Sequence, residues 1–456
     1  MAVADVHGDL PDFIAILQQT GLMNESRQWT GGASVLVQTG DMMDRGPKSR
    51  ECLDLLMDLQ RLAQTQKGNV IALLGNHEVM TLMGDLRYTS AEDYQGFATA
   101  LSENVREQAY QEYLAFLSSH QNHGGDVASA GQREKWMAEH PLGFFERRDA
   151  FGPQGVYGRW LRQHDAAVQV GSVVFVHGGL SPSLHFRHIQ ELNRRIRSDI
   201  AAFDSLWQAL TAKKIIWRYM KMEEALRQAQ SEWAAIQLRG EAEPELKEDL
   251  QKFLSLPTWF SNSPDSPIWY RGLALEPEEK LESAVDAMLA RLKIGYIVAG
   301  HTVRPKGQIA QRFDNRVFLI DTGMLKSVYG GKASALEIRD GQFTAYYADG
   351  QQQVLLPVPA AASSSSVVQE EKEEAAAEKQ LRWHGVIVRI NKDQSTMDVR
   401  KGTIEMRIRF DASTQWTKGE KVLPDMSQFK EGSDVICIGK AGAKGEFYAT
   451  RVQLQP

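Results

Sequence analysis

The sequence has little cysteine, no long apolar run and no excess of basic residues, and each absence excludes a class of protein. Only two of the 456 residues are cysteines, Cys52 and Cys437, which is too few for a disulfide scaffold, so we expect two buried thiols. No apolar stretch approaches the roughly 18 residues of a membrane span. The net charge of -6 offers no basic surface for duplex nucleic acid, so we do not expect a nucleic-acid partner.

The sequence shows no secretion signal either, although very little chain precedes its first polar cluster. Only Met1 to Ala4 can form the strand that delivers Asp5, and a typical strand has about five or six residues. A missing leader is therefore one interpretation of this start, and a compact natural start is the other. We expect a soluble protein, cytoplasmic as the sequence stands and periplasmic or secreted if a leader precedes it.

The composition that is present, 43% hydrophobic and 24% charged, is typical of a globular protein whose length favours one large and one smaller domain. Residues 1–350 alternate strands with helices and predict an α/β domain, with helical insertions at about 86–164 and 182–256. Residues 351–380 are rich in Pro, Ala, Ser and Glu and predict a linker. Short alternating strands over 381–456 predict a small OB-like β-barrel.

The first 80 residues or so repeat a βαβ pattern. A helix over Leu10 to Leu22 follows the first strand, and Asp9 is expected to cap it. The next strands are expected at Ser34 to Gln38 and Val70 to Leu74, with a later one at Val168 to Val176. Further strands are expected at Ile294 to Ala299 and Val317 to Ile320, and Asp340 and Gly341 indicate a hairpin turn.

Polar clusters follow the predicted strands of this domain. The five segments are DVHGD (Asp5 to Asp9), GDMMDRG (Gly40 to Gly46), GNHE (Gly75 to Glu78), VHGGL (Val176 to Leu180) and GHT (Gly300 to Thr302). A single histidine at a strand end is more often structural than a ligand. Five such segments in one domain indicate a shared site, because the carboxyl ends of parallel strands meet at one edge of a sheet.

The residue types in these segments fit a site for two metal ions. Carboxylates suit hard divalent cations, and imidazoles suit Mn, Fe and Zn. Asp5 and His7 stand two residues apart, so both side chains can reach one ion from the same face of a strand. Asp41 is placed to bridge two ions. Two cations about 3.5–4 Å apart can hold a hydroxide for in-line attack, which is the chemistry of phosphate ester hydrolysis.

Together the five segments resemble the signature of the phosphoprotein phosphatase family within the calcineurin-like metallophosphoesterases, over about residues 1–350. The resemblance implies a β-sandwich flanked by helices and a phosphoprotein or phosphopeptide substrate. It also implies two divalent ions of Mn, Fe or Zn. By resemblance, the first ion is bound by Asp5, His7 and Asp41, and the second by Asp41, Asn76, His177 and His301.

The same resemblance implies the roles of the remaining site residues. His77 would protonate the leaving oxygen, and Asp44 would orient that histidine and stabilise its charge. Arg45 and, in the segment IWYRG, Arg271 would bind the phosphate through planar, bidentate guanidinium groups. The helical insertions and the stretch GRWL at Gly158 to Leu161 are most similar to the bacterial-type Shewanella-like phosphatases, for which phosphoserine, phosphothreonine and phosphotyrosine are all candidate substrates.

Two alternative functions remain open at this stage. The first is a small-molecule phosphoesterase, such as a dinucleoside polyphosphate hydrolase, although Glu78 in GNHE resembles the protein phosphatase form of that segment. The second is an interaction protein that acts through the C-terminal barrel, whose partner is unknown. Trp383, Trp416, Arg407 and Arg409 could bind single-stranded nucleic acid there, but we expect them to pack or solvate a small barrel.

Overall fold

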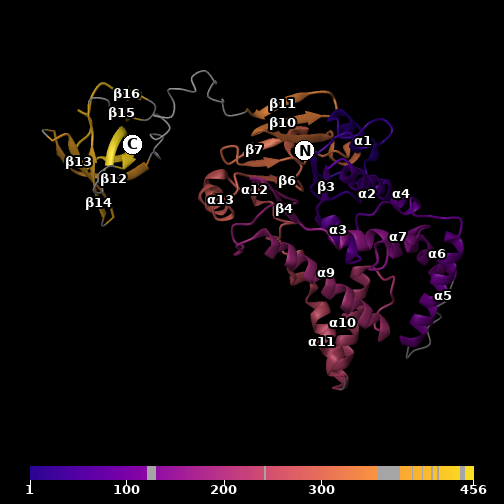
Figure 1. Ribbon diagram of the computed structural model, residues 1–456. Coiled ribbons are helices and arrows are strands. Elements are labelled where there is room, and N and C mark those ends of the chain that lie inside the picture. The colour runs from indigo at the N-terminus through magenta and orange to yellow at the C-terminus, as the bar shows by residue number, and fades with distance from the viewer. Residues whose placement is uncertain are drawn as a thin grey trace. The chain divides into compact units, whose positions relative to one another are not determined.

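The computed structural model describes residues 1–120, 130–240, 243–357 and most of 381–455, of which 393, 403, 412–413, 419–420 and 442–446 are left out. The chain divides into two compact units, Met1–Pro359 and Ala360–Pro456 (Figure 1). Each unit has its own hydrophobic core. None of the described helices combines the length and the apolar character that crossing a bilayer requires.

Two sheets form the centre of the first unit. The six-stranded sheet has the order β11-β10-β9-β1-β2-β3, in which β1, β2 and β3 are parallel and β9, β10 and β11 are antiparallel. Its strands are β1 (Ala2–Val3), β2 (Val35–Gln38), β3 (Asn69–Ala72), β9 (Ser334–Arg339), β10 (Gln342–Tyr347) and β11 (Gln352–Leu356). Asp340 and Gly341 form the predicted turn between β9 and β10, with φ of 50° and 80°.

The second sheet has five strands in the order β4-β5-β6-β8-β7, with the parallel strands β5, β6 and β8 at its centre. The strands are β4 (Ala167–Val170), β5 (Val173–Val176), β6 (Tyr296–Ala299), β7 (Ala310–Arg312) and β8 (Val317–Leu319). The run 168–176, predicted as one strand, is a hairpin of β4 and β5. Gly171, at φ 58°, and Ser172 form the two-residue turn that reverses the chain.

The sheets pack face to face through side chains that alternate along each strand. Val37 on β2, Phe175 on β5 and Val298 on β6 share one buried cluster with Phe318 and Phe343. The rings of Phe318 and Phe343 stack with centroids 4.4 Å apart. The neighbours Val3 and Leu36 point the other way, into a second cluster with helices. This is the α/β fold of mixed sheets and flanking helices that the sequence predicts.

Helices cover the outer faces of both sheets. On the first sheet lie α1 (Leu10–Gln19) and α2 (Ser49–Thr65), and on the second lies α13 (Glu278–Leu292). The Asp9 carboxylate accepts a hydrogen bond from the Asp12 N–H at 3.3 Å, which confirms the predicted cap of α1.

The two long segments expected to be helical are helical where the structure describes them. Between β3 and β4 lie α3 (Asn76–Leu82), α4 (Ala91–Gln95), α5 (Ser102–His120), α6 (Ala130–Glu139), α7 (Phe144–Phe151) and α8 (Val156–Leu161). After β5 come α9 (Ile189–Ala212), α10 (Met222–Arg239), α11 (Pro244–Leu254) and α12 (Gly272–Leu275), and α14 (Lys326–Tyr329) follows β8. In Figure 1, α10 and α11 lie side by side and extend away from the sheets.

The predicted start of the linker, at residue 351, is too early in the chain. Gln352–Leu356 is strand β11, which pairs antiparallel with β10 at the edge of the first sheet. The polar, exposed glutamines at its start resemble a linker, and the Pro- and Ser-rich composition begins only after Leu356. The rest of the predicted linker, 358–380, lies outside the described residues.

The second unit is a β domain of seven strands in the order β14-β13-β12-β17-β18-β15-β16. These are β12 (Leu381–Asn391), β13 (Thr396–Lys401), β14 (Ile404–Arg409), β15 (Gln415–Lys418), β16 (Lys421–Leu423), β17 (Asp434–Ala441) and β18 (Phe447–Leu454). Because β18 also pairs with β14, the strands β14, β13, β12, β17 and β18 are connected in a ring. Cys437 lies in its core and Cys52 in that of the first unit, both as free, buried thiols, as predicted.

Candidate metal centre

The structure brings the five sequence segments together at the carboxyl ends of the parallel strands. Each segment comes from the loop after one strand, on either sheet. Asp5 and His7 follow β1, Asp41, Asp44 and Arg45 follow β2, Asn76 and His77 begin α3 after β3, His177 follows β5, and His301 follows β6. All of these side chains except Arg45 are buried.

The backbone of these loops is held in an unusual conformation. Five residues of these loops have a positive φ, which residues other than glycine rarely adopt. They are His7 (50°), Asp41 (56°), Asp44 (65°), Arg45 (67°) and His301 (65°). Such strain persists only where the surroundings fix it, and it concentrates at functional sites. Here the Asp41 carbonyl accepts from the N–H groups of both Val6 and His7 at 2.9 Å, which ties the first two loops together.

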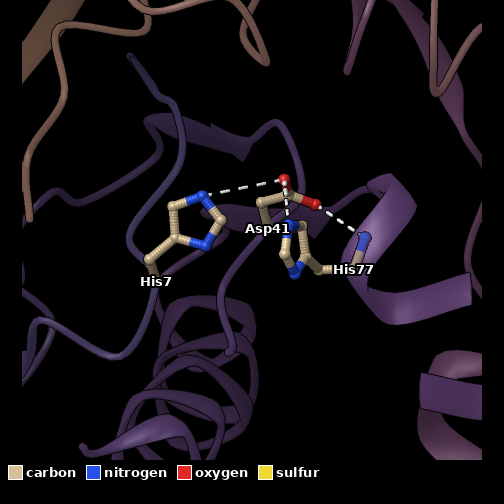
Figure 2. A group of neighbouring side chains, drawn as sticks. All are labelled: His7, Asp41 and His77. Atoms are coloured by element: carbon tan, nitrogen blue, oxygen red, sulfur yellow. Dashed lines mark hydrogen bonds and ion pairs between the residues drawn. The ribbon is translucent and has the colours of Figure 1, made fainter. Parts of the chain in front are cut away.

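One group of possible metal ligands consists of His7, Asp41 and His77 (Figure 2). The Asp41 Oδ2 atom lies 3.8 Å from His7 Nε2 and 3.9 Å from His77 Nε2. Asp5 Oδ2 lies 3.9 Å from the same His7 nitrogen. The other Asp41 oxygen, Oδ1, accepts from the His77 backbone N–H at 3.0 Å, which leaves Oδ2 facing the imidazoles.

A second group consists of Asp41, His177 and His301. His177 Nε2 lies 3.3 Å from Asp41 Oδ2, 3.1 Å from His301 Nδ1 and 3.0 Å from Asn76 Oδ1. Asp41 is therefore the carboxylate that both groups share.

The hydrogen-bond partners of the His7 and His177 rings fit a cation in this site. His177 Nδ1 faces the Thr39 carbonyl and His7 Nδ1 faces the Met43 carbonyl, both at 3.0 Å, so these nitrogens carry the protons of the neutral rings. The Nε2 lone pairs then point at Asp41 and, from His177, at the Asn76 oxygen. Buried acceptors that face one another need a positive charge between them. His301 Nε2 is also buried and has no partner among the described residues.

The electrostatics of the site reflect the same crowding of buried groups. Burial lowers the pKa of His177, but Asp41 and Asp5 outweigh burial and raise that pKa to about 9. Burial raises the pKa of Asp41, yet His177 and His77 hold it well below its usual range. Burial is the largest influence on the pKa of His7 and lowers it to about 4. With no cation, protons on His177 provide the charge that the carboxylates require.

His77 and Asp44 form a buried pair beside the first group. His77 Nδ1 donates to Asp44 Oδ2 at 3.0 Å, so the His77 Nε2 atom faces the site. Burial lowers the pKa of His77, but the charges of Asp41 and Asp44 outweigh it and raise that pKa. Burial alone would raise the pKa of Asp44. The hydrogen bond from His77 and the charge of Arg147 outweigh burial, so the pKa of Asp44 is lowered.

The two predicted phosphate-binding arginines lie at different edges of the centre. The guanidinium of Arg45 stacks on Tyr88, 4.4 Å from the ring centroid, and lies 5.5 Å from that of Tyr329. Arg271 Nη1 donates to the His301 carbonyl at 3.0 Å and to Thr302 Oγ1 at 3.2 Å. One arginine is thus next to each group of ligands.

The structure adds residues that sequence analysis did not find. Asp321 is buried, and burial raises its pKa to about 6. After burial itself, the charge of Asp321 is the largest cause that raises the pKa of Asp5. Asp321 follows β8 in the segment DTG, so the strand-end rule that found the other segments could have found it. The Tyr329 hydroxyl lies 3.2 Å from His7 Nε2, and nothing in its local sequence, KSVY, marks it as a site residue.

Comparison with known proteins agrees with this geometry. The sequence profile described as calcineurin-like phosphoesterase matches residues 1–305, which carry every residue of the centre except Asp321 and Tyr329. The chain belongs to the calcineurin-like phosphoesterase family. It is therefore an enzyme of the metallophosphoesterase class, and the groups around Asp41 are its possible metal-binding residues.

Relatives in this family include named phosphatases. The chain is 25% identical over 342 residues to Shewanella-like protein phosphatase 2 of Arabidopsis thaliana, which covers 74% of each chain. It is 24% identical over 328 residues to Shewanella-like protein phosphatase 1 of Plasmodium berghei, which covers 71% of this chain and 66% of that one. A crystal structure of a cold-active protein tyrosine phosphatase shares the fold, with a TM-score of 0.50, 21% identity, and 78% of this chain and 77% of that chain covered.

Proposed function

We propose that this protein hydrolyses phosphate monoesters on phosphorylated proteins with the help of two divalent cations. The observation that carries the proposal is the Asp41 carboxylate, which belongs to both groups of ligands. Asp5, His7 and Asp41 would hold one ion, and Asp41, Asn76, His177 and His301 the other. When bound, such a pair activates water for in-line attack and neutralises charge on the phosphate. Mn, Fe and Zn all suit this ligand set.

Arg45 and Arg271 are proposed to bind the phosphate. A guanidinium can donate two parallel hydrogen bonds to phosphate oxygens. Arg45 lies beside Tyr88, and Arg271 lies beside His301. Stacking on Tyr88 holds the Arg45 side chain without using its donors, and its Nε is buried with no partner among the described residues. This arrangement would orient the phosphorus atom over Asp41.

His77 is proposed to donate a proton to the leaving oxygen from Nε2, while Asp44 holds its Nδ1 proton. Because His77 Nε2 lies 3.9 Å from Asp41 Oδ2, His77 also belongs to a group of possible metal ligands, and the test has to separate the two roles. A general acid typically contributes about 10²–10⁴ in rate and matters most for a basic leaving group. His77→Asn should therefore keep both metals and lose far more turnover on a phosphoserine peptide than on nitrophenyl phosphate. Loss of a metal from this variant would make His77 a ligand instead.

The protein substrate is supported by the names of the relatives, two of which are protein phosphatases. A second candidate is a dinucleoside polyphosphate, because a symmetrical bis(5'-nucleosyl)-tetraphosphatase of Actinobacillus pleuropneumoniae is 24% identical over 164 residues, 35% of this chain and 55% of that one. Turnover should be compared on phosphoserine, phosphothreonine and phosphotyrosine peptides and diadenosine tetraphosphate, each with Mn, Fe and Zn. Faster turnover of the dinucleotide than of every peptide would overturn the proposal.

For the second unit we propose an OB-like barrel joined to the first by a linker. The ring of strand pairings supports the barrel. Of the residues that could stack on bases, Trp416 is only 8% exposed in the core, and Trp383 donates from its indole to the Val399 carbonyl at 3.1 Å. Arg407 pairs with Asp398 at 2.9 Å. These contacts favour a packing role over nucleic-acid binding.

A further inference from the structure

One buried arginine connects the helical segment between β3 and β4 to the His77–Asp44 pair of the centre. Arg147, on α7, is 1% exposed. Its Nη2 donates to Asp44 Oδ1 and its Nε donates to Asp93 Oδ2, both at 3.0 Å. The guanidinium packs against the Phe151 ring, 4.9 Å from its centroid. A fully buried arginine with two carboxylate partners is not explained by a solvated helix face.

These contacts close a ring of buried hydrogen bonds. The Ser49 N–H donates to Asp93 Oδ1 at 3.1 Å, and the Asp44 N–H donates to Ser49 Oγ at 3.0 Å. Asp44, Arg147, Asp93 and Ser49 are therefore each bonded to the next, and all are at most 1% exposed. Such a ring allows each member only one side-chain orientation, because any rotation leaves a buried polar group unpaired.

The ring determines which oxygen of Asp44 is left for the histidine. Asp44 Oδ1 accepts from Arg147 and from Thr89 Oγ1, both at 3.0 Å, so its hydrogen-bonding capacity is filled. Only Oδ2 is free to accept from His77 Nδ1, at 3.0 Å. A carboxylate fixed in this way holds the imidazole plane, and hence the direction of Nε2.

We propose that Arg147 is a positioning residue for His77, through which the helices between β3 and β4 set the geometry of proton donation. It acts by holding the Asp44 carboxylate with Oδ2 toward His77 Nδ1. A flexible lysine could not do this equally well, because one ammonium cannot match the fork with which a guanidinium meets two carboxylates. The inference rests on the proposed role of His77 as general acid.

The test is the dependence of turnover on the leaving group, measured on the full chain loaded with metal. Arg147→Met alone leaves two buried carboxylates without their cation, which is strongly destabilising, so this variant does not serve as the test. The variant Arg147→Met with Asp93→Asn removes one charge of each sign and is the main test. It should keep both metals by elemental analysis and lose about tenfold or more on a phosphoserine peptide, but less than about threefold on nitrophenyl phosphate.

Two further variants separate positioning from general damage. Arg148→Met is the matched control, because Arg148 is the next residue on α7 but lines a separate cavity of about 570 Å³ and donates to the Met220 carbonyl at 3.3 Å. It should show no selective loss. Arg147→Lys with Asp93→Asn restores a cation for Asp44 alone, without the fork of the guanidinium, and should recover only part of the phosphoserine turnover.

Equal losses on both substrates in the Arg147→Met and Asp93→Asn variant, or no loss, would overturn the inference. The same selective loss in Arg148→Met would also overturn it. The His77→Asn variant, assayed beside them, identifies a failure of a different kind. If His77→Asn loses turnover equally on both substrates, the general-acid role itself is wrong. If His77→Asn loses turnover mainly on the phosphoserine peptide but the Arg147→Met and Asp93→Asn variant does not, only the positioning role is refuted.

Discussion

Asp41 is the residue on which most of the candidate site depends, since its carboxylate belongs to both groups of ligands. Asp41→Asn should lose metal from both positions and reduce turnover by more than about 100-fold, because even residues that only support ligands contribute 10–100-fold to metal affinity or activity. Metal content by elemental analysis and turnover measure this.

A nearby aspartate provides the control for that change. Asp9 lies in the same segment as Asp5, but its side chain caps α1 instead of facing the site. Asparagine caps helices as well as aspartate does, so Asp9→Asn should keep the stability, the metals and the activity of the wild type. An Asp41→Asn protein with two metals and full activity would refute the shared-ligand assignment.

Glu78 holds the backbone of the site from behind. Its Oε2 accepts from the N–H groups of Asp41 and Gly75, and its Oε1 accepts from that of Met42, all at 2.8 Å. In Glu78→Gln the new amide N–H₂ must face at least one of these donors, which should destabilise the protein by about 1–3 kcal/mol. Denaturant unfolding measures the change, and the exposed Glu92→Gln serves as a control within about 0.5 kcal/mol. Unchanged stability of Glu78→Gln would contradict this role.

The segments of the candidate site could be found from sequence because each lies directly after a strand, so that local spacing carries the signal. In the structure, His7 Nε2 lies 3.9 Å from Asp5 Oδ2 and 3.8 Å from Asp41 Oδ2. Arg147 could not be predicted, since its partners Asp44 and Asp93 are 103 and 54 residues away and only the packing of α7 brings them together. Positions that depend on tertiary contacts leave no local pattern.

The helices α6 and α7 meet in an aromatic cluster that contains a buried histidine. The His140 ring stacks on Trp136 and Phe145, with centroids 4.2 Å and 5.7 Å away, and its Nδ1 donates to the Trp136 carbonyl at 2.8 Å. Burial lowers the pKa of His140 from 6.5 to about 4. A neutral imidazole is therefore part of this packing.

The lowered pKa predicts that acid destabilises these helices. Because the folded pKa lies below the unfolded one, the stabilisation is fully present above pH 6.5 and is lost as the pH falls toward 4, by about 3 kcal/mol at that point. His140→Phe keeps the stacking and cannot titrate, so its stability relative to wild type should rise over that range. Urea unfolding of both proteins at several pH values tests this, and a constant difference would show that His140 does not titrate there.

Strand boundaries were the weaker part of the sequence prediction. The parallel strands were found because each is a mainly apolar run, as at Val35–Gln38 and Asn69–Ala72. The hairpin of β4 and β5 was missed because its strands are mainly apolar and only two residues, Gly171 and Ser172, separate them. The β9–β10 turn was predicted, since Asp340 and Gly341 form a recognisable turn dipeptide.

The end of the phosphoesterase unit was predicted at Gly350, whereas the structure places β11 beyond it. β11 pairs with β10 through registers such as Phe343 with Leu356 and Tyr346 with Gln352. It also contacts the other sheet, because Gln311 Nε2 donates to the Leu355 carbonyl at 2.9 Å. Exposed glutamines at one end of an edge strand resemble a linker, so the local sequence pattern did not indicate a strand there.

Two truncations separate the predicted boundary from the observed one. A chain that ends at Pro357 keeps β11 and should retain the stability and the phosphatase activity of the full protein, because the first unit has its own core and contains the whole candidate site. A chain that ends at Gly350 loses the cross-strand pairs of β11, each worth about 0.2–1 kcal/mol, and should be less stable by about 1–3 kcal/mol. Both should turn over substrate equally at low temperature, since no ligand changes. Thermal unfolding and activity of the two chains measure this, and a loss of activity at Pro357 would instead show that the second unit contributes to catalysis.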